Sequence, residues 1–278
     1  MIDAYYFSGR GNSLAVAKEL ASRISDLRLK KITADIGRAA TEVAPASALG
    51  LVFPVIDRGM PRAVRAFIRS LDTFSSSPYA FAAITSGGMP AGILAQTRAL
   101  LARRGIDLVA AAVLPFSLSP RDAEIRAERL AALSRAIDAR APLRYEQGTF
   151  IERVALSGAA NFLAHGLIPH EAKKFTSSAS CDGCGICARI CPASNIAIES
   201  RRPRWGRKCE QCGACFAWCP KEAISGTCLA AKTRYRNPDV TLADMLANGP
   251  KEGASGATGS SLGMPKAVER AVSDEAVR

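Results

Sequence analysis

Two runs of four cysteines near the C-terminal end constrain the fold more than any other feature of the sequence. The first run is Cys181-x2-Cys184-x2-Cys187-x3-Cys191, the second is Cys209-x2-Cys212-x2-Cys215-x3-Cys219, and a proline follows each. Every cysteine of the first run recurs 28 positions later, and the two runs contain eight of the nine cysteines in the 278-residue chain. The spacing therefore predicts an internal duplication.

The spacing within each run is typical of iron–sulfur ligands. Three thiolates separated by two residues each can surround one 4Fe–4S cubane from a single loop, while the fourth, followed by proline, ligates the other cubane. We therefore predict two 4Fe–4S clusters. The ligands of the first are Cys181, Cys184, Cys187 and Cys219, and those of the second are Cys209, Cys212, Cys215 and Cys191.

Zinc sites and disulfides are the alternatives for these cysteines. Zinc modules usually pair two C-x2-C units or include histidine, which fits two unbroken runs closed by C-P poorly. The N-terminal residues lack the pattern of a signal peptide, so we expect a cytoplasmic protein, where thiols stay reduced and disulfides are rare. The ninth cysteine, Cys228, is interpreted as a plain buried thiol.

The chain opens with a strand-like run, a loop of small polar residues and a helical segment. Ile2–Phe7 is apolar and aromatic, and Leu14–Ile24 has helical periodicity. The loop between them consists of Ser8, Gly9, Arg10, Gly11, Asn12 and Ser13. Free backbone N–H groups at the start of a helix favour an anion, so this loop predicts a phosphate site. It is neither a P-loop nor a G-x-G-x-x-G motif.

Further strand-like and helical segments alternate along the first half. Strands are predicted at Leu27–Ile32, Ala48–Phe53, Tyr79–Thr85 and Leu108–Pro115, and helices at Arg62–Leu71, Ala91–Arg104 and Asp122–Arg140. Together with the first strand, this alternation predicts an α/β domain, a doubly wound five-stranded parallel sheet with helices on both faces.

Two more loops are expected at the carboxyl edge of that sheet, where such folds bind ligands. Pro54–Pro61 follows the third strand, and Ser86–Gly92 follows the fourth. Three loops meeting at one edge suit flavin mononucleotide (FMN). The residues predicted to flank its ring are Pro54, Val55, Ile56, Thr85, Ser86, Gly87 and Gly88. The alternative is that glycine and proline merely turn the chain there.

These motifs resemble a known combination of domains. Phe7-Ser-Gly-Arg-Gly-Asn-Ser13 resembles the F-S-G-T-G-N-[ST] loop of flavodoxin-like domains. With the two cysteine runs, residues from Met1 to about Met245 resemble the flavodoxin–ferredoxin fusion family, or EFR-type ferredoxins. The resemblance implies a flavodoxin-like domain, a small α+β bacterial-type dicluster ferredoxin domain, FMN with two 4Fe–4S clusters, and electron transfer. The chain departs from the family at Arg10, where threonine is usual, and in lacking aromatic residues in the two ring-flanking loops.

The predicted domain boundaries follow from these segments. Residues 1–142 form the FMN-binding domain, 143–175 a helical linker with a helix near Val154–Leu167, 176–230 the ferredoxin domain, and 231–278 a C-terminal extension predicted to be disordered after about 247. The two histidines, His165 and His170, lack spaced partners and are interpreted as structural.

Composition narrows the function. The net charge is +12, no apolar run approaches membrane-spanning length, and no nucleic-acid motif is present. We expect redox partner proteins. The net charge is interpreted either as a solvated basic surface or as a face that steers an acidic partner. Arg201–Lys208 is interpreted either as a charged turn or as a docking site beside the second cluster.

Electron transfer between FMN and the clusters is the predicted function. The alternatives are a flavin-dependent reductase, with Asp57 and Arg58 as the titratable loop residues, and a redox or oxygen sensor.

Overall fold

The structure is a computed structural model that describes residues 1–33, 48–57, 59–73, 77–88, 90, 92–117, 119–145, 174–226 and 234–247. The chain divides into two compact units. The first contains Met1–Ser8 and Asn12–Leu167, and the second contains Gly9–Gly11 and Ile168–Arg278.

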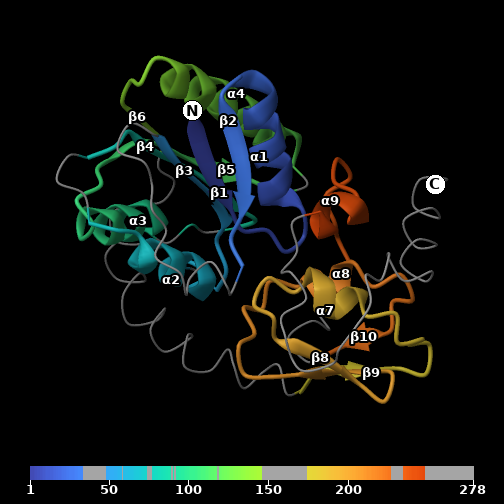
Figure 1. The fold of residues 1–278 in the computed structure, drawn as a ribbon. Helices are drawn as coiled ribbons and strands as arrows, with labels where there is room; N and C mark the ends of the chain where they lie inside the picture. Colours follow the sequence, from blue (N-terminus) through green and yellow to red (C-terminus); the bar gives the residue numbers. More distant parts are fainter. Residues whose placement is uncertain are drawn as a thin grey trace. The chain divides into compact units, whose positions relative to one another are not determined.

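The first unit is built on a parallel sheet of six strands in the order β2-β1-β3-β4-β5-β6 (Figure 1). The strands are β1 (Ile2–Tyr6), β2 (Leu27–Lys31), β3 (Ala48–Pro54), β4 (Ala80–Ser86), β5 (Leu108–Pro115) and β6 (Leu143–Tyr145). The first five have the 2-1-3-4-5 order of flavodoxin-like sheets, which confirms the predicted α/β class. The sixth strand differs from the prediction, which placed five strands in the sheet and began the linker at Leu143.

The central strands are apolar because both faces of the sheet are covered. Every residue of β1 and β4 is buried, and so are all residues of β3 except the last. In the pair β3–β4, Gly50 lies opposite Phe81. A Cβ atom added to Gly50 would lie 2.3 Å from Cζ of Phe81, so the ring occupies the space that the glycine leaves. Close packing of this kind tolerates no extra methyl group.

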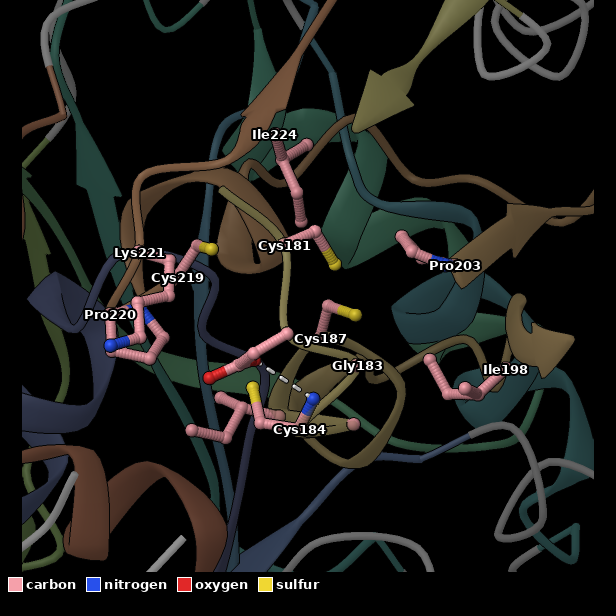
Figure 2. A pocket seen from close by; sticks show the side chains of 13 residues that line it. Cys181, Gly183, Cys184, Cys187, Ile198, Pro203, Cys219, Pro220, Lys221 and Ile224 are labelled. Atoms are coloured by element: carbon pink, nitrogen blue, oxygen red, sulfur yellow. Dashed lines mark hydrogen bonds between the residues drawn. The ribbon is translucent and has the colours of Figure 1, made fainter. Parts of the chain in front are cut away.

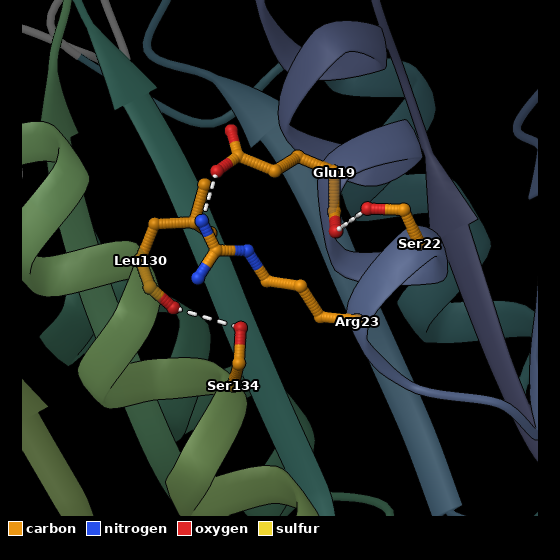
Figure 3. A network of polar contacts seen from close by, with 5 residues as sticks. All are labelled: Glu19, Ser22, Arg23, Leu130 and Ser134. Atoms are coloured by element: carbon orange, nitrogen blue, oxygen red, sulfur yellow. Dashed lines mark hydrogen bonds and ion pairs between the residues drawn. The ribbon is translucent and has the colours of Figure 1, made fainter.

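Four helices cover the sheet: α1 (Asn12–Arg23), α2 (Arg62–Ser70), α3 (Ile93–Ala102) and α4 (Pro120–Asp138). Helix α1 contacts α4, and α2 contacts α3, on opposite faces (Figure 1). Figure 3 shows α1 and α4 side by side, with Arg23 ion-paired to Glu19 one turn earlier at 2.6 Å. Ser134 Oγ of α4 donates to the Leu130 carbonyl at 2.9 Å. Each of these two polar contacts lies within a single helix.

Tyr79, directly before β4, anchors the end of α4. Its hydroxyl lies 3.0 Å from the Ala136 carbonyl oxygen and 3.1 Å from that of Ala141, and it donates to them. Burial raises the pKa of Tyr79 although the nearby Arg140 guanidinium lowers it. The neutral phenol is therefore the form that the fold favours.

Among the described residues of the second unit are two small antiparallel pairs of strands and three short helices. Strand β7 (Thr176–Ser177) pairs with β10 (Ile224–Ser225), and β8 (Ile196–Glu199) pairs with β9 (Arg202–Trp205). The helices are α7 (Ile186–Ile190), α8 (Ala214–Ala217) and α9 (Leu242–Leu246). Helix α9 begins at a capping box in which Thr241 and Asp244 bond each other's backbone N–H.

The backbone of this unit repeats with the 28-residue period of the cysteines. Helices α7 and α8 begin after Gly185 and Gly213, which lie 28 positions apart and have φ angles of +77° and +73°. Ser194 N–H donates to the Cys191 carbonyl at 3.1 Å, and Glu222 N–H donates to the Cys219 carbonyl at the same distance. The internal duplication read from the sequence is thus present in the local geometry.

Several predictions fall outside the described residues, namely the helix near Val154–Leu167, His165, His170, Cys228 and the tail after residue 247. Within the described ranges, no helix is long and apolar enough to cross a membrane.

Candidate functional site

Four thiols from both cysteine runs line one pocket of the second unit. Cys181, Cys184 and Cys187 come from the first run and Cys219 from the second, and Figure 2 shows the four side chains around this pocket. Gly183, Gly185 and Pro220 also line it. The structure therefore brings together the four residues that the sequence predicted as ligands of the first cluster.

The other four thiols form a second group. Cys212 interacts electrostatically with Cys191, Cys209 and Cys215, and Cys215 interacts with Cys191, Cys209 and Cys187. Backbone N–H groups lie beside two of the sulfurs: Asn195 N–H points to Cys191 Sγ and Gln211 N–H to Cys209 Sγ, each at 3.4 Å. The fourth cysteine of each run thus lies beside cysteines of the other run.

Burial raises the pKa of four of the thiols, those of Cys184, Cys187, Cys212 and Cys215. Desolvation and then the neighbouring Cys184 and Cys219 raise the pKa of Cys187 to about 12. The pKa of Cys215 is raised by burial and by Cys191, although the Trp205 indole N–H lowers it. That N–H is buried without a nitrogen or oxygen acceptor among the described residues. Thiolates in such groups need bound positive charge, which iron ions supply.

Among the described residues, no three His, Cys, Asp or Glu side chains converge closely enough to hold a single metal ion.

Arg234 is a residue whose role sequence reasoning missed. Its guanidinium donates to the carbonyl oxygens of Phe216 and Glu222 at 2.6 Å each and of Ile224 at 2.7 Å. It also lies over the Phe216 ring, 4.0 Å from the centroid. These carbonyls flank Cys219 on both sides, so Arg234 fixes the backbone on which this thiol is mounted. Nothing in the local sequence signals a contact that spans 10 to 18 residues.

In the first unit, the carboxyl ends of β1, β3, β4 and β5 lie at one edge of the sheet. Helix α1 begins there at Asn12. Ser13 Oγ of its first turn lies 2.8 Å from Thr85 Oγ1 near the end of β4. Ser8 is 1% exposed, and its hydroxyl oxygen has no hydrogen-bond partner among the described residues. A buried hydroxyl at a helix N-terminus fits the oxygen of a phosphate group.

The middle of the predicted phosphate loop, Gly9–Gly11, groups with the second unit. There Gly9 carbonyl oxygen accepts a 3.0 Å hydrogen bond from the Trp218 indole N–H. Burial lowers the pKa of Arg10, whose guanidinium interacts with Cys212. Arg10 thus interacts with a cysteine of the second run.

The two loops predicted to flank a flavin ring are short and hydrogen-bonded. Ile56 and Gly59 exchange backbone hydrogen bonds of 3.0 and 2.9 Å, which leaves Pro54, Val55 and Ile56 partly exposed. Ser86 Oγ donates to the Gly88 carbonyl at 2.6 Å, so this side chain closes its own loop. A Cβ atom at Gly88 would meet no atom within 4 Å, and at Gly87 only the Phe116 carbonyl at 3.5 Å. The space beside both glycines is open to a ligand.

Phe116 is an aromatic residue at this edge that the sequence interpretation overlooked. Its N–H donates to the Ser86 carbonyl at 2.7 Å, and the Arg126 guanidinium lies 4.4 Å from its ring centroid. The available signal was its position directly after β5, because every parallel strand ends at the same edge.

Comparisons with known proteins leave the family open. No protein-family profile matches the chain, and no curated protein sequence matches it. Among solved structures, a Trp repressor binding protein from Bacillus subtilis is 15% identical, with a TM-score of 0.37 over 49% of this chain and 96% of its own. Rubredoxin oxygen:oxidoreductase from Desulfovibrio gigas is 17% identical, with a TM-score of 0.30 over 50% of this chain and 36% of its own. The azoreductase AzrA is 9% identical, with a TM-score of 0.34 over 50% of this chain and 97% of its own. Likenesses this low support no functional argument.

Proposed function

We propose that this chain is an electron-transfer protein that binds two 4Fe–4S clusters in its second unit and FMN in its first. The grouping of eight thiols into two sets, each completed by the last cysteine of the other run, is the observation on which the proposal rests. A chance gathering of cysteines has no reason to repeat a backbone pattern at a fixed period. A pair of cluster-binding loops requires it.

In this proposal, Cys181, Cys184, Cys187 and Cys219 hold the first cluster, and Cys209, Cys212, Cys215 and Cys191 hold the second. Bound clusters pass one electron each, and FMN passes one or two. The protein's own part is to exclude water and to orient donors. Buried Ile186, Phe216 and Trp218 shield the thiols, and backbone N–H groups face the sulfurs of Cys191 and Cys209. Hydrogen bonds of this kind tune cluster potentials.

The FMN site is proposed at the carboxyl edge of the sheet. Ser8 with its unpartnered hydroxyl, Asn12 and Ser13 at the start of α1 would hold the phosphate. The open space beside Gly87 and Gly88 and the partly exposed Val55 would accept the ring. In the two ring-flanking loops, Asp57 is the single described residue with an ionisable side chain, so a reductase that protonates a substrate is the weaker hypothesis.

The test is the cofactor content of anaerobically purified protein. We expect about eight irons, eight sulfides and one FMN per chain. Cys219→Ala should lose the first cluster and retain about four irons, and Cys191→Ala should lose the second. Cys228→Ala, outside the two runs, is the matched control and should retain both. Bound zinc in place of iron, or full iron in both ligand variants, would refute the assignment.

A further inference from the structure

One edge of the second unit combines positive charge, an exposed apolar side chain and the first thiol group. The inference drawn from it depends on the proposed function, because it concerns where electrons enter or leave. The feature is the β8–β9 hairpin together with Arg207 and Lys208, called the basic hairpin below.

The charge of the described segment 174–226 is concentrated in the basic hairpin. The segment has eight Lys and Arg and four Asp and Glu, and five of the basic but only one of the acidic residues lie between Glu199 and Lys208. The remaining three basic and three acidic residues cancel. The excess positive charge of this segment therefore belongs to the hairpin.

The inner face of the hairpin turns toward the thiols. Ile198 is paired with Pro203 in the register, and both line the pocket of Cys181, Cys184, Cys187 and Cys219 (Figure 2). Next along the hairpin, Ile196 and Trp205 pack against the cluster of buried residues that includes Cys187 and Cys215. The sequence interpretation left open a charged turn or a docking site beside the second cluster. The tip of the hairpin lies at the first thiol group, while Lys208 directly precedes Cys209 of the second run.

Ile198 is 38% exposed, and apart from Met1 no other large hydrophobic residue in the described ranges is exposed. It lines the thiol pocket on one face of the hairpin, while Arg202 and Arg204 alternate onto the other face. An apolar side chain beside charged residues is typical of protein–protein interfaces rather than of nucleic-acid sites, where side chains meet phosphates. The apolar side chain thus favours a protein partner.

The hairpin is held rigidly while its charges stay available. Its turn is formed by Ser200 and Arg201, whose φ angles are +47° and +61°. Arg201 donates to the Asp182 carbonyl at 2.9 Å, and Arg202 donates to the Ser178 carbonyl. Both contacts are to neutral carbonyls, which leave the charge uncompensated. Arg204 lies 3.8 Å from Glu199, but the two side chains are 71% and 67% exposed, so this pair is weak.

We propose that the basic hairpin is the docking surface for an acidic one-electron carrier protein, which exchanges electrons with the first cluster. The arginines steer the partner toward this edge, and the exposed Ile198 supplies an apolar contact. Electrostatic steering of this kind acts mainly on the association rate and weakens with salt.

The test uses the full chain with its clusters and an acidic plant-type ferredoxin as the probe. Binding is measured by surface plasmon resonance and electron exchange by stopped flow, at low and high salt. Arg204→Glu combined with Arg207→Glu should lower the association rate about tenfold at low salt and little at high salt. Arg103→Glu combined with Arg121→Glu changes the net charge equally in the first unit and should have a much smaller effect.

Iron content is measured on every variant, so that the two proposals are separated. If the wild-type chain holds no clusters, the proposed function fails and the docking proposal fails with it. If the clusters are present but the hairpin and control variants behave alike, the docking proposal alone is wrong. Tighter binding to a basic cytochrome c or to a short DNA duplex than to the acidic ferredoxin would also overturn it.

Discussion

Ser8 allows the proposed phosphate site to be tested by two effects of opposite sign. Its hydroxyl is buried and unpartnered, and burial of such a group costs about 1–3 kcal/mol in protein mutational data. Ser8→Ala should therefore stabilise the flavin-free first unit by about 1 kcal/mol. A hydrogen bond to a charged group contributes about 1.5–3 kcal/mol, so the same variant should bind FMN roughly 10- to 100-fold more weakly.

Stability must be read in the first unit alone. Both tryptophans, Trp205 and Trp218, belong to the second unit, so their fluorescence reports on the wrong part of the chain. Hydrogen exchange of peptides from β1 and β4 in increasing urea gives the free energy of unfolding of the sheet. FMN affinity follows from the quenching of flavin fluorescence on titration.

Ser13→Ala is the matched control because its hydroxyl is already bonded to Thr85. This variant leaves the buried Thr85 hydroxyl without a partner and should destabilise the flavin-free sheet by about 1–3 kcal/mol. The reasoning is refuted if Ser8→Ala destabilises the sheet as Ser13→Ala does, or if it leaves the dissociation constant of FMN within twofold of the wild type.

Three further predictions concern packing, pH and one ligand loop. Gly50→Ala should lower the free energy of unfolding of the first unit by about 1–3 kcal/mol, because the new Cβ meets the Phe81 ring. Hydrogen exchange measures this free energy, and an unchanged value would contradict the close packing of Gly50 against Phe81. Because burial raises the pKa of Tyr79, the folded state holds this proton more tightly than the unfolded chain. Stability should be full below about pH 10 and fall as pH rises through the folded pKa, and Tyr79→Phe should remove this part of the fall in urea titrations. Asn195→Ala removes the oxygen that accepts a hydrogen bond from the Lys208 N–H at 2.6 Å and should speed iron loss from the second cluster. Asn195→Asp keeps an acceptor oxygen and should not. Equal rates of iron release from the two variants would show that this hydrogen bond does not hold the ligand loop.

The strands of the first unit were predictable because buried parallel strands are continuous apolar runs. Ala80–Ser86 and Ala48–Pro54 were found to within about a residue for this reason. Strand β6 was missed because Leu143–Tyr145 has three residues with a charged one in the middle. This segment forms a strand only because it pairs with the edge of β5, and a pairing between distant residues cannot be read from the local sequence.

In the candidate sites too, features set by nearby residues could be predicted, whereas contacts between distant residues could not. Cysteine spacing predicts three ligands of each set because three cysteines within one short loop can surround a cubane. The fourth ligand of each set comes from the other run and is predicted from the family pattern instead. The bond between Ser13 and Thr85 joins residues 72 positions apart, so the sequence could name Ser13 as polar but could not show that its hydroxyl is engaged. Ser8, at the other end of the same loop, has no such partner among the described residues.

The exchange of Cys191 and Cys219 between the two thiol groups has a consequence for the origin of this unit. A peptide with a single run contains four cysteines, yet it directs only three of them to one pocket and turns the fourth away. Such a peptide completes a ligand set only by donating its last cysteine to a second copy of itself and receiving one in return. The 28-residue repeat is therefore the form that two joined copies of such a peptide would take. Asn195 and Trp205 have Ala223 and Thr233 at the corresponding positions of the repeat, so the two halves are not chemically identical.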